Sequence, residues 1–136
     1  MPRSKVATSI RRLLDDEPLE DGRSHPAEAF LRPYLSGGGP ALDAWCEGLL
    51  GGAVRCSERA ALLRLLARVG LPHATDVRLR LVGQALTNAE PEVRDAAIQS
   101  AETWGDPALH TVLLAHVDQQ DWLQGYAHRV AADLDR

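Results

Sequence analysis

PEVRDAAIQSAETWGDPAL, from Pro91 to Leu109, is the stretch of sequence that decides the fold. Its apolar residues recur at i, i+3, i+4, i+7, i+8 and i+11, which is the spacing of one face of an α-helix. Pro91 suits the first turn of such a helix, and Gly105 can end it in a left-handed conformation. Asp106 can then cap a second helix that Pro107 begins. We therefore expect two helices joined by a very short turn.

The following helix pair repeats this apolar pattern. A shift of about thirty positions, a length typical of helical repeats, superimposes the apolar residues, with Val93 on Leu123, Ala97 on Ala127, Ala101 on Ala131 and Trp104 on Leu134. We expect one helical hairpin at 76–87 and 91–104 and a second at 107–117 and 121–134, with Asp121 capping the last helix. A single hairpin cannot bury its apolar face alone, so the hairpins should stack.

Further helices are expected upstream, at 57–69 with Ser57 as its cap, at 40–50, at 26–35 with Pro33 breaking or kinking it, and at 4–14. The predicted fold is all-α, a short α-solenoid of about seven to eight helices stacked as antiparallel hairpins. Residues 1–39 form a helical and loop extension, and residues 40–136 form the repeat domain. We expect the two to make one compact unit.

The composition agrees with a helical chain. Leucine supplies 21 and alanine 20 of the 136 residues, whereas valine and isoleucine together supply only 11. Large all-β sandwiches need more β-branched and aromatic residues than this. A hydrophobic content of 45% and a formal net charge of −4 argue against a disordered chain.

Residues 86–97, LTNAEPEVRDAA, resemble the turn and second-helix start of the HEAT-repeat family. The shared pattern is a leucine ending the first helix, a polar turn residue, a proline, then Val-Arg and alanines. The resemblance implies an α-solenoid acting mainly as a protein-binding scaffold, although some members bind nucleic acid and a few are enzymes. It also implies that Arg94 and Asn88 brace the turn. In the next repeat, Trp122 and Leu123 stand where the family has Val-Arg.

No phosphate-binding loop, nucleophile elbow, HExxH or paired CxxC motif occurs in the sequence. The densest set of ligand-type residues is His110, His116, Asp118 and Asp121. The two histidines lack the i, i+4 spacing of a helical metal site, and Asp121 is better explained as a helix cap. We therefore predict no metal, no cofactor and no catalysis.

Three polar residues of the helix that starts at Pro91 are candidates for binding a protein partner, since Asp95, Gln99 and Glu102 lie at i, i+4 and i+7 on one face. For any one of the three, a plain solvated face is the simpler interpretation. Trp122 lies out of phase with the apolar stripe of its helix and four residues before Tyr126. An exposed tryptophan next to a tyrosine is typical of an interface anchor, and the alternative is that Trp122 packs on the preceding helix pair.

Arginine-rich residues 55–80 suggest an alternative function, the binding of nucleic acid. The candidates there are Arg59, Arg64, Arg68, Arg78 and Arg80. The following segment, 81–136, has nine acidic residues against three basic ones, which disfavours binding to phosphates. We therefore expect these arginines to pair with acidic residues of that segment.

The composition also bears on the compartment and on the kind of partner. Arginine outnumbers lysine 14 to 1, which is typical of a GC-rich bacterial coding sequence. No run approaches the roughly 20 apolar residues of a membrane-spanning helix, and no secretory signal is evident. We expect a cytoplasmic protein whose partner is another protein, with no membrane contact and with nucleic acid disfavoured. Self-association is left open.

Overall fold

The computed structural model describes residues 3–20, 22–35, 55–69 and 75–135, which contain seven α-helices, one short 3-10 helix and no strand. The helices are α1 (Arg3–Asp16), α2 (Pro26–Leu35), α4 (Cys56–Val69), α5 (Thr75–Leu86), α6 (Pro91–Trp104), η1 (Pro107–Leu109), α7 (His110–Ala115) and α8 (Asp121–Leu134). The predicted all-α class is confirmed. The helix expected at 40–50 and the division between residues 39 and 40 lie outside the described residues. None of the described helices is long and apolar enough to cross a membrane.

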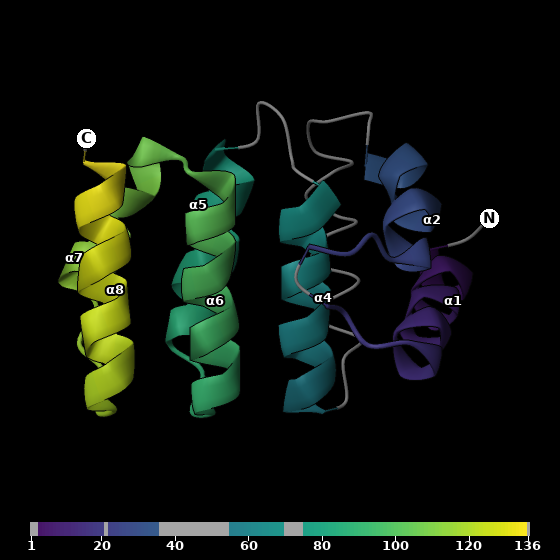
Figure 1. Ribbon diagram of the computed structural model, residues 1–136, viewed down its shortest axis with the longest axis horizontal. Helices are drawn as coiled ribbons and strands as arrows, with labels where there is room; N and C mark the ends of the chain where they lie inside the picture. Colours follow the sequence, from purple (N-terminus) through teal and green to yellow (C-terminus); the bar gives the residue numbers. More distant parts are fainter. Residues whose placement is uncertain (1–2, 21, 36–54, 70–74, 136) are drawn as a thin grey trace.

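Helices α4, α6 and α8 lie side by side in one row, and α5 and α7 lie behind α6 and α8 (Figure 1). Helix α6 contacts α4 on one side and α8 on the other, and it contacts α5 behind it. Helices α6 and α8 both begin at the lower end of the molecule and run upward, while their hairpin partners run down. Helices α1 and α2 lie at the opposite end from α7 and α8, with α2 against α4.

Small side chains explain how α6 packs against so many neighbours. Ala96, Ala97 and Ala101 of α6 are fully buried, and so are Ala127 and Ala131 of α8. Alanine keeps a high helix propensity while allowing two helix backbones to approach closely. The abundance of alanine in the sequence is therefore explained by helices with neighbours on several sides.

The corner between α6 and α7 has the geometry that the sequence predicts. Gly105 ends α6 with φ 62°, the left-handed conformation that glycine adopts readily. A side-chain oxygen of Asp106 accepts a hydrogen bond from the Ala108 amide at 3.0 Å and so caps η1. The other oxygen of Asp106 accepts bonds from Thr75 Oγ1 at 2.9 Å and Arg78 Nη1 at 3.1 Å. The cap thus also ties this corner to the start of α5.

Three predictions of helix ends and caps need correction. The helix expected at 107–117 is split, since its first turn is η1 and α7 ends at Ala115. Asp121 is the first residue of α8 rather than its cap, because Asp118 already organises this turn by accepting a bond from the Gln120 amide at 2.9 Å. Helix α4 begins at Cys56, which places Ser57 inside the helix.

Helix α2 has the expected bounds. It continues through Pro33 to Leu35, so of the two expected effects of the proline, a break does not occur. Pro33 lies near the C-terminal end of α2, and few intrahelical hydrogen bonds remain for it to disturb there.

The apolar core is continuous from α1 to α8. It includes Ile10 of α1, Ala27 and Leu31 of α2 and extends to Leu134 of α8. The connection between α1 and α2 is held to α4 by Arg68, whose guanidinium donates to the carbonyl oxygens of Glu20 and Arg23 at 2.6 and 2.8 Å. The two N-terminal helices therefore dock on the same core as the C-terminal hairpins.

Candidate functional site

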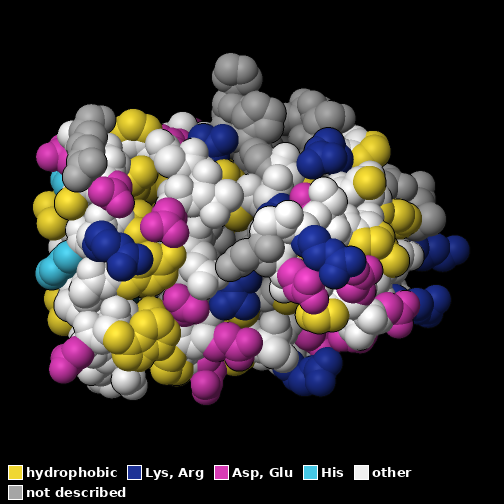
Figure 2. Space-filling model, viewed as in Figure 1, with side chains coloured by type: hydrophobic (Ala, Val, Ile, Leu, Met, Phe, Trp, Pro, Cys, Tyr) yellow, Lys and Arg dark blue, Asp and Glu magenta, His cyan; other side chains and the backbone are white. Residues whose placement is uncertain are grey.

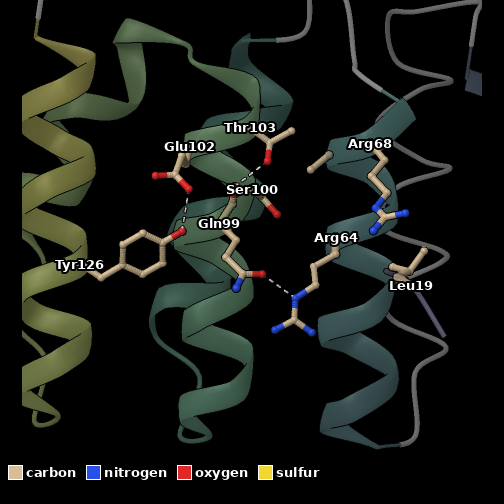
Figure 3. Close-up of a pocket in the computed structure, with 9 residues that line it drawn as sticks. Leu19, Arg64, Arg68, Gln99, Ser100, Glu102, Thr103 and Tyr126 are labelled. Carbon is tan, nitrogen blue, oxygen red and sulfur yellow. Dashed lines mark hydrogen bonds between the residues drawn. The ribbon is translucent and has the colours of Figure 1, made fainter. Parts of the chain in front are cut away.

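A polar groove of about 580 Å³ opens on the face formed by α4, α6 and α8 (Figure 3). Helix α4 contributes Arg64 and Arg68, α6 contributes Gln99, Ser100, Glu102 and Thr103, and α8 contributes Tyr126. Leu19, from the connection between α1 and α2, closes one side. The groove thus brings together residues of the protein-binding candidates and of the arginine-rich segment, which lie far apart in the sequence.

Arg64 reaches across the groove from α4 to α6. Its Nε donates to Gln99 Oε1 at 2.7 Å, and its Nη2 lies 3.5 Å from Asp95 Oδ2. Gln99 in turn donates to the same carboxylate at 3.3 Å. Burial raises the pKa of Asp95 more than the charge of Arg64 lowers it. Asp95 and Gln99 are therefore half-buried partners of Arg64, and the alternative of a plain solvated face is wrong for both.

Tyr126 joins α8 to α6. Its hydroxyl donates to Glu102 Oε1 at 3.0 Å, and the guanidinium carbon of Arg129 lies 4.9 Å from the centre of its ring. Burial raises the pKa of Tyr126 well above its ordinary value, and the bond to Glu102 and the negative charges of Glu102 and Asp95 raise it further. The tyrosine therefore stays neutral and acts here as a hydrogen-bond donor.

Trp122 is 56% exposed, so it does not pack away on the preceding helix pair. Trp122, Tyr126 and Arg129 follow one another at i, i+4 and i+7, which places them on one side of α8. We call these three residues the aromatic face. Figure 2 shows apolar side chains exposed over the lower half of α8, with acidic side chains next to them. The sequence analysis missed Arg129, although its spacing from Trp122 and Tyr126 was the signal for it.

The arginines of the nucleic-acid alternative do not form a continuous basic strip. Arg68 contacts two carbonyl oxygens and lies 3.5 Å from Glu28, and Arg78 pairs with Asp106 at 3.1 Å and lies over Trp104. Arg64 and Arg78 thus pair with acidic residues of the C-terminal segment, as expected. The expectation is wrong for Arg68, which docks on the connection between α1 and α2 and pairs with Glu28 instead. Figure 2 shows basic and acidic side chains interspersed over α4 and the N-terminal helices.

Two further arginines of that alternative, Arg59 of α4 and Arg80 of α5, are half-buried and do not line the groove. Binding to the phosphate backbone of a nucleic acid needs clustered cations that replace the counterions of several phosphates. Cations that are divided between the groove and the α5–η1 corner do not provide such a cluster.

The turn between α5 and α6 is held by the two residues that the family resemblance indicates. Arg94 Nη1 donates to the carbonyl oxygens of Asn88 and Ala89, each at 2.9 Å. The Asn88 side chain accepts from the Glu90 amide at 2.9 Å, directly before Pro91 begins α6. These contacts make the turn a structural feature rather than a binding site.

Asp118 completes this arrangement and was not predicted as a bracing residue. Its carboxylate accepts from Arg94 Nε at 2.9 Å and from His116 Nε2 at 2.8 Å. Burial alone raises the pKa of Asp118, but the hydrogen bonds from Arg94, His116 and the Gln120 amide, together with the charge of Arg94, lower it to about 2. Asp118 is therefore a buried, ionised link between two successive hairpins.

The four residues considered for a metal are divided between two places. His116 donates to Asp118, whereas His110 donates through Nδ1 to the carbonyl oxygen of Ala131 at 2.6 Å. Asp121 is exposed at the start of α8. In the described ranges, no three histidine, cysteine or acidic side chains are grouped so that they could hold a metal ion.

No family model, curated protein or solved structure matches this chain. The face formed by α4, α6 and α8 combines a groove whose polar groups are bonded to one another with an exposed tryptophan beside it.

Proposed function

We propose that this protein is a non-catalytic protein-binding module, a short HEAT-like α-solenoid that holds its partner on the face formed by α4, α6 and α8. The observation that carries the proposal is Trp122, which is 56% exposed and aligned with Tyr126 and Arg129. Tryptophan, tyrosine and arginine are the residue types that contribute most to the free energy of protein–protein binding. Their alignment beside a groove supports an interface.

The arrangement of the hairpins supports the solenoid part of the proposal. The turn held by Arg94 and Asn88 leads into α6, and Asp118 ties that turn to the start of the next hairpin. Helices α6 and α8 run in the same direction side by side (Figure 1). A row of parallel helices gives repeat proteins an extended binding surface.

The dimensions of this face fit a protein partner. Helices α4, α6 and α8 each have 14 residues and are therefore about 21 Å long. Three such helices, spaced by about 8–10 Å, present a surface more than 20 Å wide. A partner helix or a small domain can lie across that surface and contact both the groove and the aromatic face.

The internal bonding of the groove also supports binding rather than catalysis. Arg64 is held by Gln99 and Asp95, and Tyr126 is held by Glu102. A catalytic acid or base needs a pKa near the working pH and a position from which it can transfer its proton. The shift of the Tyr126 pKa is away from neutral pH, which does not serve proton transfer.

Partner capture tests the proposal. The full chain is immobilised and exposed to lysate of the native host, and Trp122→Ala is compared with Leu114→Ala. Leu114 is a matched control because it is also 56% exposed but lies on α7, in the row behind α8. We expect Trp122→Ala to reduce the amount of captured partner about tenfold or more, while Leu114→Ala retains it. Both variants should keep the helical circular dichroism of the parent, since both side chains are exposed.

If the two variants capture the same partners in the same amounts as the parent chain, the partner does not bind at the aromatic face and the assignment of this surface is wrong.

A further inference from the structure

Carboxylates lie in the first turns of α6 and α8, at the end of the face where the exposed tryptophan also lies. Asp121 and Trp122 are the first two residues of α8, and Glu92 lies in the first turn of α6. Helices α6 and α8 are in contact and both begin at this end of the molecule (Figure 1). Glu102, higher on α6, reaches Tyr126 of the same aromatic face. Figure 2 shows acidic side chains next to exposed apolar ones over the lower part of this face.

These carboxylates form no salt bridge with any described residue, although Glu102 shares Tyr126 with Arg129. Within the described part of the chain, Glu92, Glu102 and Asp121 form no ion pair, whereas the more buried acids of the same segment do. Asp95 is paired with Arg64, Asp106 with Arg78 and Asp118 with Arg94, as described above. Glu92 and Asp121, in the first turns of α6 and α8, therefore keep negative charge without a salt-bridge partner among the described residues, at the end of the face where Trp122 lies.

The aromatic face already contains one cation–π contact. Arg129 lies over the ring of Tyr126 at 4.9 Å, while Glu102 accepts the bond from the tyrosine hydroxyl. A cation over an electron-rich ring next to a carboxylate is stabilised by both. Trp122, one turn away, has the ring that binds cations best. Among the described residues, no arginine or lysine lies over this indole.

We propose that the aromatic face takes a basic segment of a partner protein, with an arginine or lysine of the partner stacked on the indole of Trp122 and its charge facing the carboxylates of Glu92 and Asp121. The inference rests on the proposed function and names the class of partner for the same surface. Charge complementarity selects this occupant. An acidic segment or a nucleic acid brings negative charge toward carboxylates that have no counter-ion.

The experiment uses labelled synthetic peptides and the full chain. The probe is a helical peptide about as long as α8, with arginines and leucines at helical spacing, and its matched versions carry glutamate or glutamine in place of arginine. Fluorescence anisotropy measures binding at low and at physiological salt. We expect the arginine peptide to bind at least about tenfold more tightly than the glutamate and glutamine peptides, and to weaken as salt rises.

Variants of the chain locate the binding. Trp122→Ala should weaken binding of the arginine peptide about tenfold. Glu92→Gln combined with Asp121→Asn should weaken it several-fold and flatten its salt dependence, because two of the attracting charges are lost. The control combines Asp16→Asn with Glu17→Gln. It removes the same charge at the far end of the molecule, where α1 ends, and should change neither quantity.

Three results would overturn the inference. The first is equal binding of the arginine, glutamate and glutamine peptides. The second is a charge variant at Glu92 and Asp121 that binds like the control. The third is a chain that sediments as a dimer and becomes a monomer on Trp122→Ala, because the face would then bind a second copy of this chain.

The two proposals can fail separately. If Trp122→Ala abolishes capture of the native partner but the arginine peptide does not bind, the proposed function stands and the basic partner is wrong. If the arginine peptide binds as expected but capture is unchanged by Trp122→Ala, the face binds basic segments and the proposed function is wrong.

Discussion

Asp118 shows at the level of one residue how a buried charge can link two hairpins. Its side chain has no exposed surface, and its carboxylate is bonded to Arg94, to His116 and to the Gln120 amide. A buried carboxylate without partners would be protonated or would destabilise the fold. The hydrogen bonds and the charge of Arg94 outweigh the cost of burial, so Asp118 remains ionised over the whole physiological range.

The stability of the protein should therefore depend on pH through Asp118. Its pKa is about 2 in the folded chain against an ordinary value of 3.8, so the unfolded chain binds its proton first as the pH falls. The stabilisation is fully present above about pH 5 and is lost as the pH falls toward 2. It corresponds to about 2 kcal/mol at neutral pH.

Urea unfolding at a series of pH values from neutral down to about 2 measures this dependence. The parent chain should lose more free energy of unfolding on acidification than Asp118→Asn, because asparagine has no proton to gain. Asp16→Asn, at an exposed carboxylate, should retain the pH dependence of the parent. An Asp118→Asn variant that follows the parent curve at every pH would show that Asp118 is not the group that titrates.

At the level of the helices, two glycines that look alike in the sequence play opposite parts. Gly105 ends α6 with φ 62°, and Gly83 lies inside α5. An added methyl group would meet no atom within 4 Å at either position. The difference between the two substitutions is therefore one of backbone conformation alone.

Alanine at these positions should change stability in opposite directions. Gly105→Ala should lower the free energy of unfolding by about 1 kcal/mol, because alanine is strained in the left-handed conformation. Gly83→Ala should raise it by about 0.5–1 kcal/mol, since alanine loses less conformational entropy in a helix. Chemical denaturation of both variants measures the pair, and two changes of the same sign would contradict the backbone explanation. Gly105→Asn should cost less than Gly105→Ala, because asparagine tolerates this conformation.

The helices were predictable where their ends carry strong local signals. Pro91 and Gly105 set both ends of α6, and the VRLRLV segment at 77–82 forms a helix although it alternates like a strand. The helix after Asp106 was predicted too long. Its apolar spacing continues beyond Ala115, but the bonds of His116 and Asp118 turn the chain there. Asp118 is in turn held by Arg94 of the neighbouring hairpin, and neither kind of bond is visible in helical spacing.

The candidate site was also predictable only where local spacing along one helix decides the arrangement. Helical spacing places Asp95, Gln99 and Glu102 on one face, and the structure keeps them together. It does not say which helix that face meets, so Arg64, more than thirty residues away, was assigned to a different function. The exposure of Trp122 was left open for the same reason. An out-of-phase tryptophan is buried or exposed according to the neighbouring helix, and no local rule decides between the two.

For the whole molecule, the central question is whether α1 and α2 belong to the same folding unit as the C-terminal hairpins. Leu31 of α2 is fully buried in the core that also contains residues of α6 and α8. His25, which is 4% exposed, accepts from the Ala27 amide at 3.0 Å and donates to the carbonyl oxygen of Glu17. Together with Arg68, these bonds fix the connection between α1 and α2 on α4. A core shared in this way favours cooperative unfolding of the described helices.

Leu31→Ala tests this cooperativity. Loss of a buried leucine costs about 2–5 kcal/mol. Hydrogen exchange of the slowest amides measures the free energy of global unfolding. If α2 unfolds together with the rest, this free energy should fall by the same amount for the slowest amides of α4, α6 and α8. Leu109→Ala, at a fully buried leucine near the other end, should act on the same amides to a similar degree. Loss of protection confined to α1 and α2 in the Leu31→Ala variant would mean that residues 1–39 are an extension that unfolds on its own.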